Sequence, residues 1–296
     1  MIYLDHFQLR EAPFSITPDT SFFYAGASSQ EALNTLLVAV KSGEGFIKLT
    51  GEVGTGKTLL CRTFLASLDE SWVTAYIPNP YLEPKTLLMA LAEELGISVD
   101  DSFDQHRLFR AINHALLNFA RHKRHVVLCL DEAQAMPLET IETLRLLTNL
   151  ETEKRKLLQV ILFGQPELDE RLAAPAVRQI RQRITFQHQL ATLTPTEVGQ
   201  YLAHRMWVAG YRQDPVFTAH AARIIHKASR GVPRLVNILA HKSLMIAYGQ
   251  GTRRVGWREI RAAVDDTPAS YRVRNAWVWF ALLCLAFSGT GAMLIK

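Results

Sequence analysis

Hydrophobic residues in the first two thirds of the chain form two kinds of pattern that alternate along the sequence. Short apolar runs, typical of strands buried on both faces of a sheet, occupy residues 46–50, 72–77, 125–130, 157–163 and 184–188. Apolar residues three or four positions apart, typical of amphipathic helices, occupy residues 29–42, 59–65, 84–95, 104–120 and 137–150. Strands that alternate with helices predict an α/β fold, with a parallel sheet covered by helices on both faces.

After residue 190 the strand pattern stops and only helical patterns follow. Thr194 and Glu197 have the spacing of a capping box, with Pro195 at the first helical position. Helices are predicted over residues 195–210, 218–229, after residue 234 and over 257–264. We expect this region to form a small all-helical module packed behind the sheet.

A phosphate-binding sequence follows the first predicted strand directly. Residues 51–58 match the pattern G-x-x-x-x-G-K-[ST], in which glycines let backbone amides converge on an anion. Lys57 would contact the β- and γ-phosphates of ATP, and the Thr58 hydroxyl would bind Mg²⁺. An ordinary Gly-rich turn is the alternative, but the strand before and the helix after favour nucleotide binding. The predicted nucleotide-binding residues are Gly51, Glu52, Val53, Gly54, Thr55, Gly56, Lys57, Thr58 and Leu59.

Polar residues also follow two later strands of the predicted sheet. The apolar run 125–130 ends in Asp131 and Glu132. We expect Asp131 to hold Mg²⁺ and Glu132 to act as the general base for the attacking water. Gln165, after the next long strand, is a candidate to bind the γ-phosphate or that water. Acidic and amide residues in a surface turn are the alternative at both places.

The N-terminal 25 residues combine aromatic residues with proline. Phe7, Phe14, Phe22 and their aromatic neighbours stand in a segment without a regular pattern. Bulky apolar side chains in an irregular segment must pack against other parts of the protein. We therefore expect this arm to lie across the core, near the nucleotide base.

Composition narrows the class of protein without identifying it. The 296 residues are 48% hydrophobic, enough for a substantial core, and the net charge of +5 is only mildly basic. Such a charge does not by itself indicate nucleic-acid binding. Cys61, Cys129 and Cys284 lack metal-binding or redox spacing, and we interpret them as reduced packing residues of a cytosolic domain.

An uncharged apolar segment occupies residues 276–295. Twenty helical residues extend about 30 Å, which is the thickness of one hydrocarbon core. Trp277 and Trp279 stand where an interfacial aromatic belt belongs, and Arg272 and Arg274 flank the same end. The segment predicts a transmembrane helix with the preceding chain in the cytoplasm. A buried terminal helix is the alternative.

Taken together, these motifs resemble an AAA+ ATPase. The sequence Gly-Val-Pro-Arg at residues 231–234 resembles the second-sensor motif of that class, in which Arg234 would reach the γ-phosphate. The resemblance also implies that an arginine before the fifth strand acts on the nucleotide of a neighbouring subunit. Arg183 is our candidate, with Arg178 and Arg181 as alternatives. A cationic helix end would explain three arginines without any catalytic role.

More narrowly, nearly the whole chain resembles the general secretion pathway protein A family, and within it the proteins of MSHA pilus biogenesis. The resemblance rests on the phosphate-binding loop, the Gly-Val-Pro-Arg sequence and four further motifs, at residues 3–7 (YLDHF), 13–19 (PFSITPD), 131–134 (DEAQ) and 164–168 (GQPEL).

This resemblance implies an ATPase of the bacterial inner membrane, single-pass, with a cytoplasmic ATPase domain that binds ATP and Mg²⁺. It would work as a homo-oligomeric ring with proteins of a type IV (MSHA-like) pilus or a type II secretion apparatus. Longer members carry a peptidoglycan-binding domain after the membrane span. Because only Lys296 follows the span here, direct peptidoglycan binding is not expected. We expect an arm (1–28), an AAA+ nucleotide-binding core (29–189), a helical lid (190–266), a basic juxtamembrane linker (267–275) and the transmembrane helix (276–295).

Two other functions remain open at this point. A DNA-transaction ATPase of the transposition or replication type would share the core, but such proteins add a DNA-reading module or a strongly basic stripe. Nucleic acid is therefore not an expected partner. A nucleotide switch with negligible hydrolysis would not need the second carboxylate, Glu132.

Overall fold

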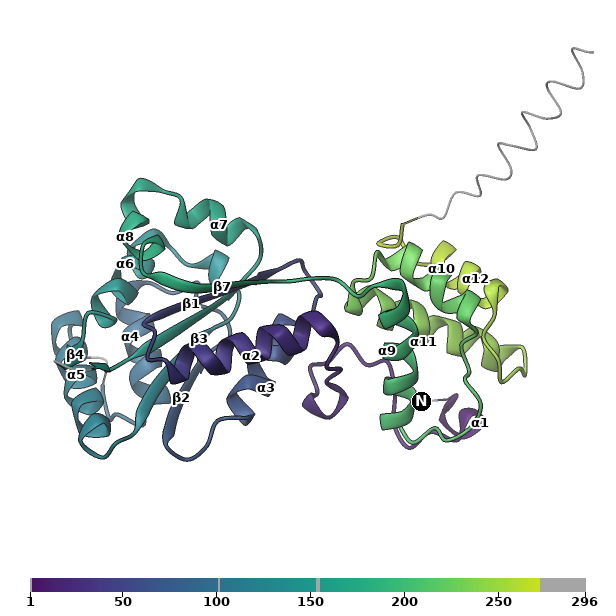
Figure 1. Cartoon of the computed structure of the whole chain (residues 1–296), viewed down its shortest axis with the longest axis horizontal. Coiled ribbons are helices and arrows are strands. Elements are labelled where there is room, and N and C mark those ends of the chain that lie inside the picture. Colours follow the sequence, from purple (N-terminus) through teal and green to yellow (C-terminus); the bar gives the residue numbers. More distant parts are fainter. Residues whose placement is uncertain (1, 101, 153–154, 272–296) are drawn as a thin grey trace, which may run out of the picture.

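The computed structural model describes residues 2–100, 102–152 and 155–271, which form an α/β part and a helical part (Figure 1). The α/β part contains five parallel strands in the order β2-β3-β6-β1-β7. Their bounds are β1 Phe46–Gly51, β2 Trp72–Ile77, β3 His125–Leu130, β6 Gln159–Gly164 and β7 Ile184–Leu190. The parallel sheet predicted from the alternating pattern is confirmed.

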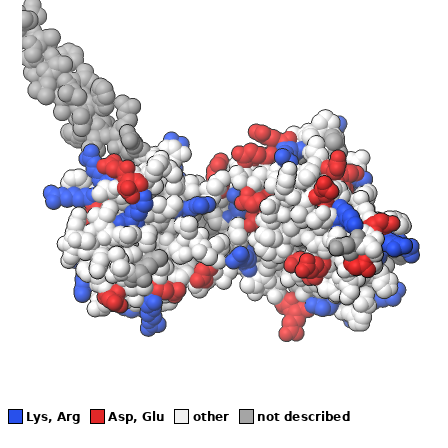
Figure 2. Space-filling view, turned by 180° about the vertical axis from the view of Figure 1, so that it is seen from behind, with Lys and Arg blue, Asp and Glu red and all other residues white. Residues whose placement is uncertain are grey.

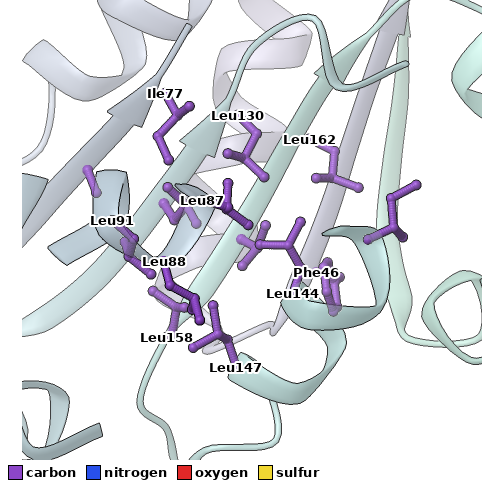
Figure 3. Close-up of a cluster of buried hydrophobic side chains, with 14 of the residues drawn as sticks. Phe46, Ile77, Leu87, Leu88, Leu91, Leu130, Leu144, Leu147, Leu158 and Leu162 are labelled. Atoms are coloured by element: carbon purple, nitrogen blue, oxygen red, sulfur yellow. The ribbon is translucent and has the colours of Figure 1, made fainter. Parts of the chain in front are cut away.

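Helices cover both faces of this sheet. On one face α2 (Ala27–Lys41) and α3 (Lys57–Ala66) pack against alternate residues of β1, β3 and β6. On the other face lie α4 (Pro84–Glu94), α5 (Gln105–Arg121) and α6 (Leu138–Leu147). Each fully buried leucine contributes roughly 1.5–3 kcal/mol relative to an exposed one. Figure 3 shows this second core, with labelled residues Phe46, Ile77, Leu87, Leu88, Leu91, Leu130, Leu144, Leu147, Leu158 and Leu162.

Several short elements were not predicted from the sequence. They are the β4–β5 hairpin (Glu151–Thr152 with Arg155–Lys156), the helices α7 (Glu167–Leu172) and α8 (Arg178–Arg181), and the 3₁₀ turns η2 (Ala133–Ala135) and η3 (Pro175–Val177). The longest of these helices, α7, has six residues and therefore fewer than two turns, and each strand of the hairpin has two residues, too few for a periodic pattern to appear.

The helical part consists of α9 (Pro195–Val208), α10 (Ala219–Ser229), α11 (Pro233–Gly249) and α12 (Trp257–Asp265). The predicted capping box of Thr194 and Glu197 is formed at the start of α9. Gly231, which precedes α11, has a φ of +74°, and a Cβ there would lie 2.0 Å from the Leu193 carbonyl oxygen. Glycine is therefore required where the chain enters the Gly-Val-Pro-Arg turn.

The N-terminal arm, with α1 (Leu4–Phe7) and the 3₁₀ turn η1 (Thr20–Phe22), packs mainly on the helical part. Arg205 of α9 fastens it there: Nε donates to the Pro13 carbonyl at 2.5 Å and Nη2 to the Ser15 carbonyl at 3.3 Å. The guanidinium also lies 4.7 Å from the centre of the Phe22 ring. The expectation that the arm crosses the α/β core is thus wrong for most of its length. Helices already cover both faces of the sheet, whereas α9 and α11 offer apolar surface.

The predicted membrane segment, residues 276–295, lies outside the described residues, as does the end of the linker before it. Within residues 2–100, 102–152 and 155–271, no helix combines the length and apolar character needed to cross a bilayer.

Candidate functional site

The carboxyl ends of β1, β3 and β6 meet at one edge of the sheet. Thr50 of β1 is in register with Gly164 of β6, and Leu130 of β3 is in register with Leu162 of β6. The phosphate-binding loop, the Asp131–Glu132 pair and Gln165 follow these strands directly. Residues far apart in sequence therefore come together as the parallel arrangement predicts.

The phosphate-binding loop turns through two glycines and leads into α3, which begins at Lys57. Gly54 has a φ of +83° and Gly56 a φ of +101°, values that favour glycine. Lys57 is only 5% exposed, and its Nζ donates to the carbonyls of Gly51 (2.8 Å) and Glu52 (3.1 Å). Burial lowers the pKa of Lys57, and the nearby carboxylates, Glu132 first among them, oppose this shift. A buried ammonium held by carbonyl oxygens is suited to bind phosphate.

Asp131 and Thr58 form the predicted metal-binding pair. The Thr58 hydroxyl donates to Asp131 Oδ2 at 2.5 Å, and the Tyr76 hydroxyl lies 3.4 Å from the same oxygen. Asp131 is 2% exposed, and burial is the main cause that raises its pKa above the usual value. A bound cation would offset this cost of burying the carboxylate.

The donor set fits Mg²⁺ rather than a metal caged entirely by protein. No group of three or more His, Cys, Asp or Glu side chains converges within the described ranges. Mg²⁺ is typically bound through one or two carboxylates together with substrate phosphates and water. Asp131 and the Thr58 hydroxyl would supply the protein ligands, and ATP the others.

Glu132 adopts the left-handed backbone conformation, with φ 53° and ψ 38°. Its Oε2 accepts hydrogen bonds from the side-chain amides of Gln134 (2.6 Å) and Gln165 (3.0 Å). The structure thus places Gln165 beside the predicted general base.

The helical part closes over the phosphate-binding loop. The Arg234 backbone N–H donates to the Gly54 carbonyl at 3.1 Å, and a Cβ on Gly54 would lie 2.7 Å from Arg234 Cβ. A pocket of about 210 Å³ lies between these elements and also contacts Glu132 and arm residues 15–18. Only this short part of the arm lies near the expected position. Two larger cavities, about 700 and 730 Å³, contain none of the residues predicted to bind nucleotide.

Arg183 does not join this pocket within its own chain. It directly precedes β7, whose first residue, Ile184, is in register with Phe46 at the start of β1. Five residues of strand separate that level from Gly51, roughly 16 Å along the sheet. The Arg183 guanidinium instead donates to the Asn149 side chain. Arg183 therefore does not contact the nucleotide pocket of its own chain, and its action on a neighbouring subunit stays a prediction.

Three residues at or beside the pocket received no role from the sequence. Gln134 and Tyr76 contact the two carboxylates, and Arg205 holds the arm against the pocket wall. A signal existed for Tyr76, because it lies near the carboxyl end of a strand whose neighbours carry the site. Arg205 gave none, because its partners are backbone carbonyls about 190 residues away.

The fold and site define an AAA-type nucleotide-binding protein of the P-loop class, and residues 40–172 match the AAA domain family. The fold is also that of Cdc6p from Pyrobaculum aerophilum, with a TM-score of 0.65 and 17% identity over 83% of this chain and 70% of that one. The ORC2 protein of Aeropyrum pernix gives a TM-score of 0.62 with 18% identity, over 88% of this chain and 74% of that one. A single-residue variant of RuvB from Thermotoga maritima gives 0.58 with 17% identity, over 85% and 73%. At these identities the likeness shows the fold alone.

Sequence similarity identifies the family. The chain is 40% identical to General secretion pathway protein A of Aeromonas hydrophila over 289 residues. The aligned region covers 97% of this chain. The chain belongs to this family of AAA-domain proteins, as its motifs predicted. It spans about half, 52%, of that relative's length.

Proposed function

We propose that this protein is a membrane-anchored ATPase that assists the assembly of a type II secretion apparatus or a type IV pilus of the MSHA kind. One observation carries the ATPase part of this proposal. A buried lysine, a buried carboxylate and a second carboxylate held by two amides converge at one edge of the sheet: Lys57, Asp131 and Glu132. Binding alone would require only the first two of these groups.

The chemistry follows from what each residue can do. Lys57 and the loop amides would bind the phosphates of ATP and orient the γ-phosphate. Thr58 and Asp131 would hold Mg²⁺, which would supply positive charge to offset that of the phosphates. Glu132 would accept a proton from water as its oxygen bonds to the γ-phosphorus and the bond to the β–γ bridging oxygen breaks. Gln165, beside Glu132, would orient that water.

Membrane anchoring is part of the proposal and rests on the uncharged sequence of residues 276–295. The full chain should resist alkaline extraction from membranes, and a reporter fused after Lys296 should behave as periplasmic. A chain ending at Tyr271 should be released, because it lacks residues 276–295. It should still fold, because it keeps the contacts that close the helical part, including the hydrogen bond from Tyr271 N–H to the Ala228 carbonyl. Extraction of the full chain without detergent would contradict the anchor.

The assembly role is supported by the family and is tested by isolating partners. Glu132→Gln should retain ATP, so its isolation from detergent-solubilised membranes in the presence of ATP should recover pilus or secretion proteins. Lys57→Ala, which should not bind ATP, is the matched control and should recover fewer of them. The same partners with both variants would argue against a nucleotide-dependent assembly role. Recovery of none with either would argue against the assembly role itself.

On the face that Figure 2 shows, the charge distribution does not favour the DNA-transaction alternative. Figure 2 shows basic and acidic side chains interspersed over both parts of the molecule on that face, without a continuous basic stripe. Phosphate-backbone recognition depends on such a stripe. The likeness to the solved ORC2 and RuvB structures shows the fold alone and does not support nucleic acid as a ligand of this chain.

A further inference from the structure

Gln134 bridges the predicted general base and the end of strand β6. It lies in η2, two residues after Glu132. Its Nε2 donates to Glu132 Oε2 at 2.6 Å, and its Oε1 accepts from the Gln165 backbone N–H at 3.0 Å. A backbone N–H can only donate, so the reversed amide would place two donors together. The two contacts therefore define which end of the amide faces Glu132.

Glu132 requires such external support. Residues with a Cβ occupy the left-handed region mainly where their surroundings hold them there. The Glu132 N–H donates to Asp131 Oδ1 at 3.0 Å, which fixes one side of the turn. The amides of Gln134 and Gln165 then hold a single carboxylate oxygen, Oε2. Among the hydrogen bonds of the described residues none reaches the other oxygen, Oε1.

The end of β6 leaves room for this bridge. A Cβ at Gly164 would lie 3.3 Å from Gln134 Oε1 and 2.7 Å from Leu168 Cδ2. Glu132 lines the nucleotide pocket, whereas Gln134 is not among the residues that line it. Gln134 therefore acts on the reaction through the residues that it contacts, Glu132 and Gln165, rather than on the nucleotide directly.

We propose that Gln134 is a positioning residue for hydrolysis. It holds Glu132 by Oε2 and ties it to the end of β6, so that Oε1 is presented to the attacking water. This inference rests on the proposed ATPase function.

A purely structural role for Gln134 makes a different prediction, because the two roles use different atoms of the amide. Anchoring η2 to β6 needs only the acceptor Oε1, whereas positioning Glu132 needs the donor Nε2. Gln134→Glu keeps the size and an acceptor but removes the donor and brings two carboxylates together. Gln134→Met keeps the length and removes both contacts. An anchoring role makes Gln134→Glu the milder change; a positioning role makes it the more severe.

The test measures kcat and KM for Mg-ATP in the wild type and both variants, with thermal unfolding to compare their stability. Gln134→Met should lower kcat about tenfold, the scale of one hydrogen bond to a charged group, with KM within about twofold. Gln134→Glu should lower kcat further. The proposal is overturned if Gln134→Met retains wild-type kcat, if Gln134→Glu is the more active variant, or if only KM changes. If the wild type does not hydrolyse ATP, the proposed ATPase function fails together with the role of Gln134. If the wild type is active and the variants are unaffected, only the role of Gln134 fails.

Discussion

Glu132→Gln should bind Mg-ATP with wild-type affinity and hydrolyse it at least about a hundredfold more slowly, the scale for loss of a general base. The glutamine has the size of the glutamate, but its amide cannot take the proton from water. Its side-chain oxygen can still accept from Gln134 and Gln165, so the local structure should persist. The Thr58–Asp131 pair and Lys57 are unchanged, which is why binding should survive. Nucleotide affinity and single-turnover hydrolysis measure the two effects separately.

Lys57→Ala is the counterpart and should lose ATP affinity. Lys57 is a buried cation beside the phosphate-binding loop, and removing it leaves phosphate charge without its partner. Thermal unfolding without nucleotide should stay close to that of the wild type, whereas stabilisation by ATP should disappear. Normal turnover by Glu132→Gln, or normal affinity in Lys57→Ala, would contradict the assignment of the site.

Arg183→Ala should abolish hydrolysis while leaving ATP affinity near normal. Arginines that complete a neighbour's site contribute on the order of 10³–10⁵ in rate in the best-studied phosphoryl-transfer systems. Arg183 lies at the sheet edge opposite its own pocket, so its loss should not disturb binding there. The measurement is steady-state hydrolysis at protein concentrations where the chain assembles, together with nucleotide affinity.

Mixing experiments distinguish action on a neighbour from action within one chain. Arg183→Ala mixed with Lys57→Ala should regain part of the activity, because some interfaces then join an intact pocket to an intact arginine. Arg178→Ala and Arg181→Ala are the matched controls and should remain active if Arg183 is the acting residue. Asn149→Ala removes the side chain that Arg183 contacts within its own chain and should also be tolerated. Absence of rescue at every ratio, with both proteins folded and assembled, would count against the role.

The sequence by itself determined the sheet, most of the helices and the location of the nucleotide pocket. Runs such as 126–130 are apolar throughout, which is typical of a strand covered on both faces. In a parallel sheet all strands end at one edge, so motifs that follow β1, β3 and β6 must meet. Strand direction places Lys57, Asp131 and Gln165 at the same edge, and the strand order β3-β6-β1 brings them together.

Only the tertiary structure decided the contacts that depend on distances between elements. The arm was expected on the α/β core, yet it packs on the helical part, because burial of aromatic residues is not directional and many apolar surfaces satisfy it equally. Arg205 contacts backbone carbonyls of the arm. Every residue has a backbone carbonyl, so the sequence does not indicate which of them Arg205 contacts. Gln134 was visible as part of Asp-Glu-Ala-Gln, but its bridge depends on the left-handed turn at Glu132 and the space at Gly164. Periodicity encodes which side chains are buried, and only the folded backbone determines which polar atoms come within hydrogen-bonding distance.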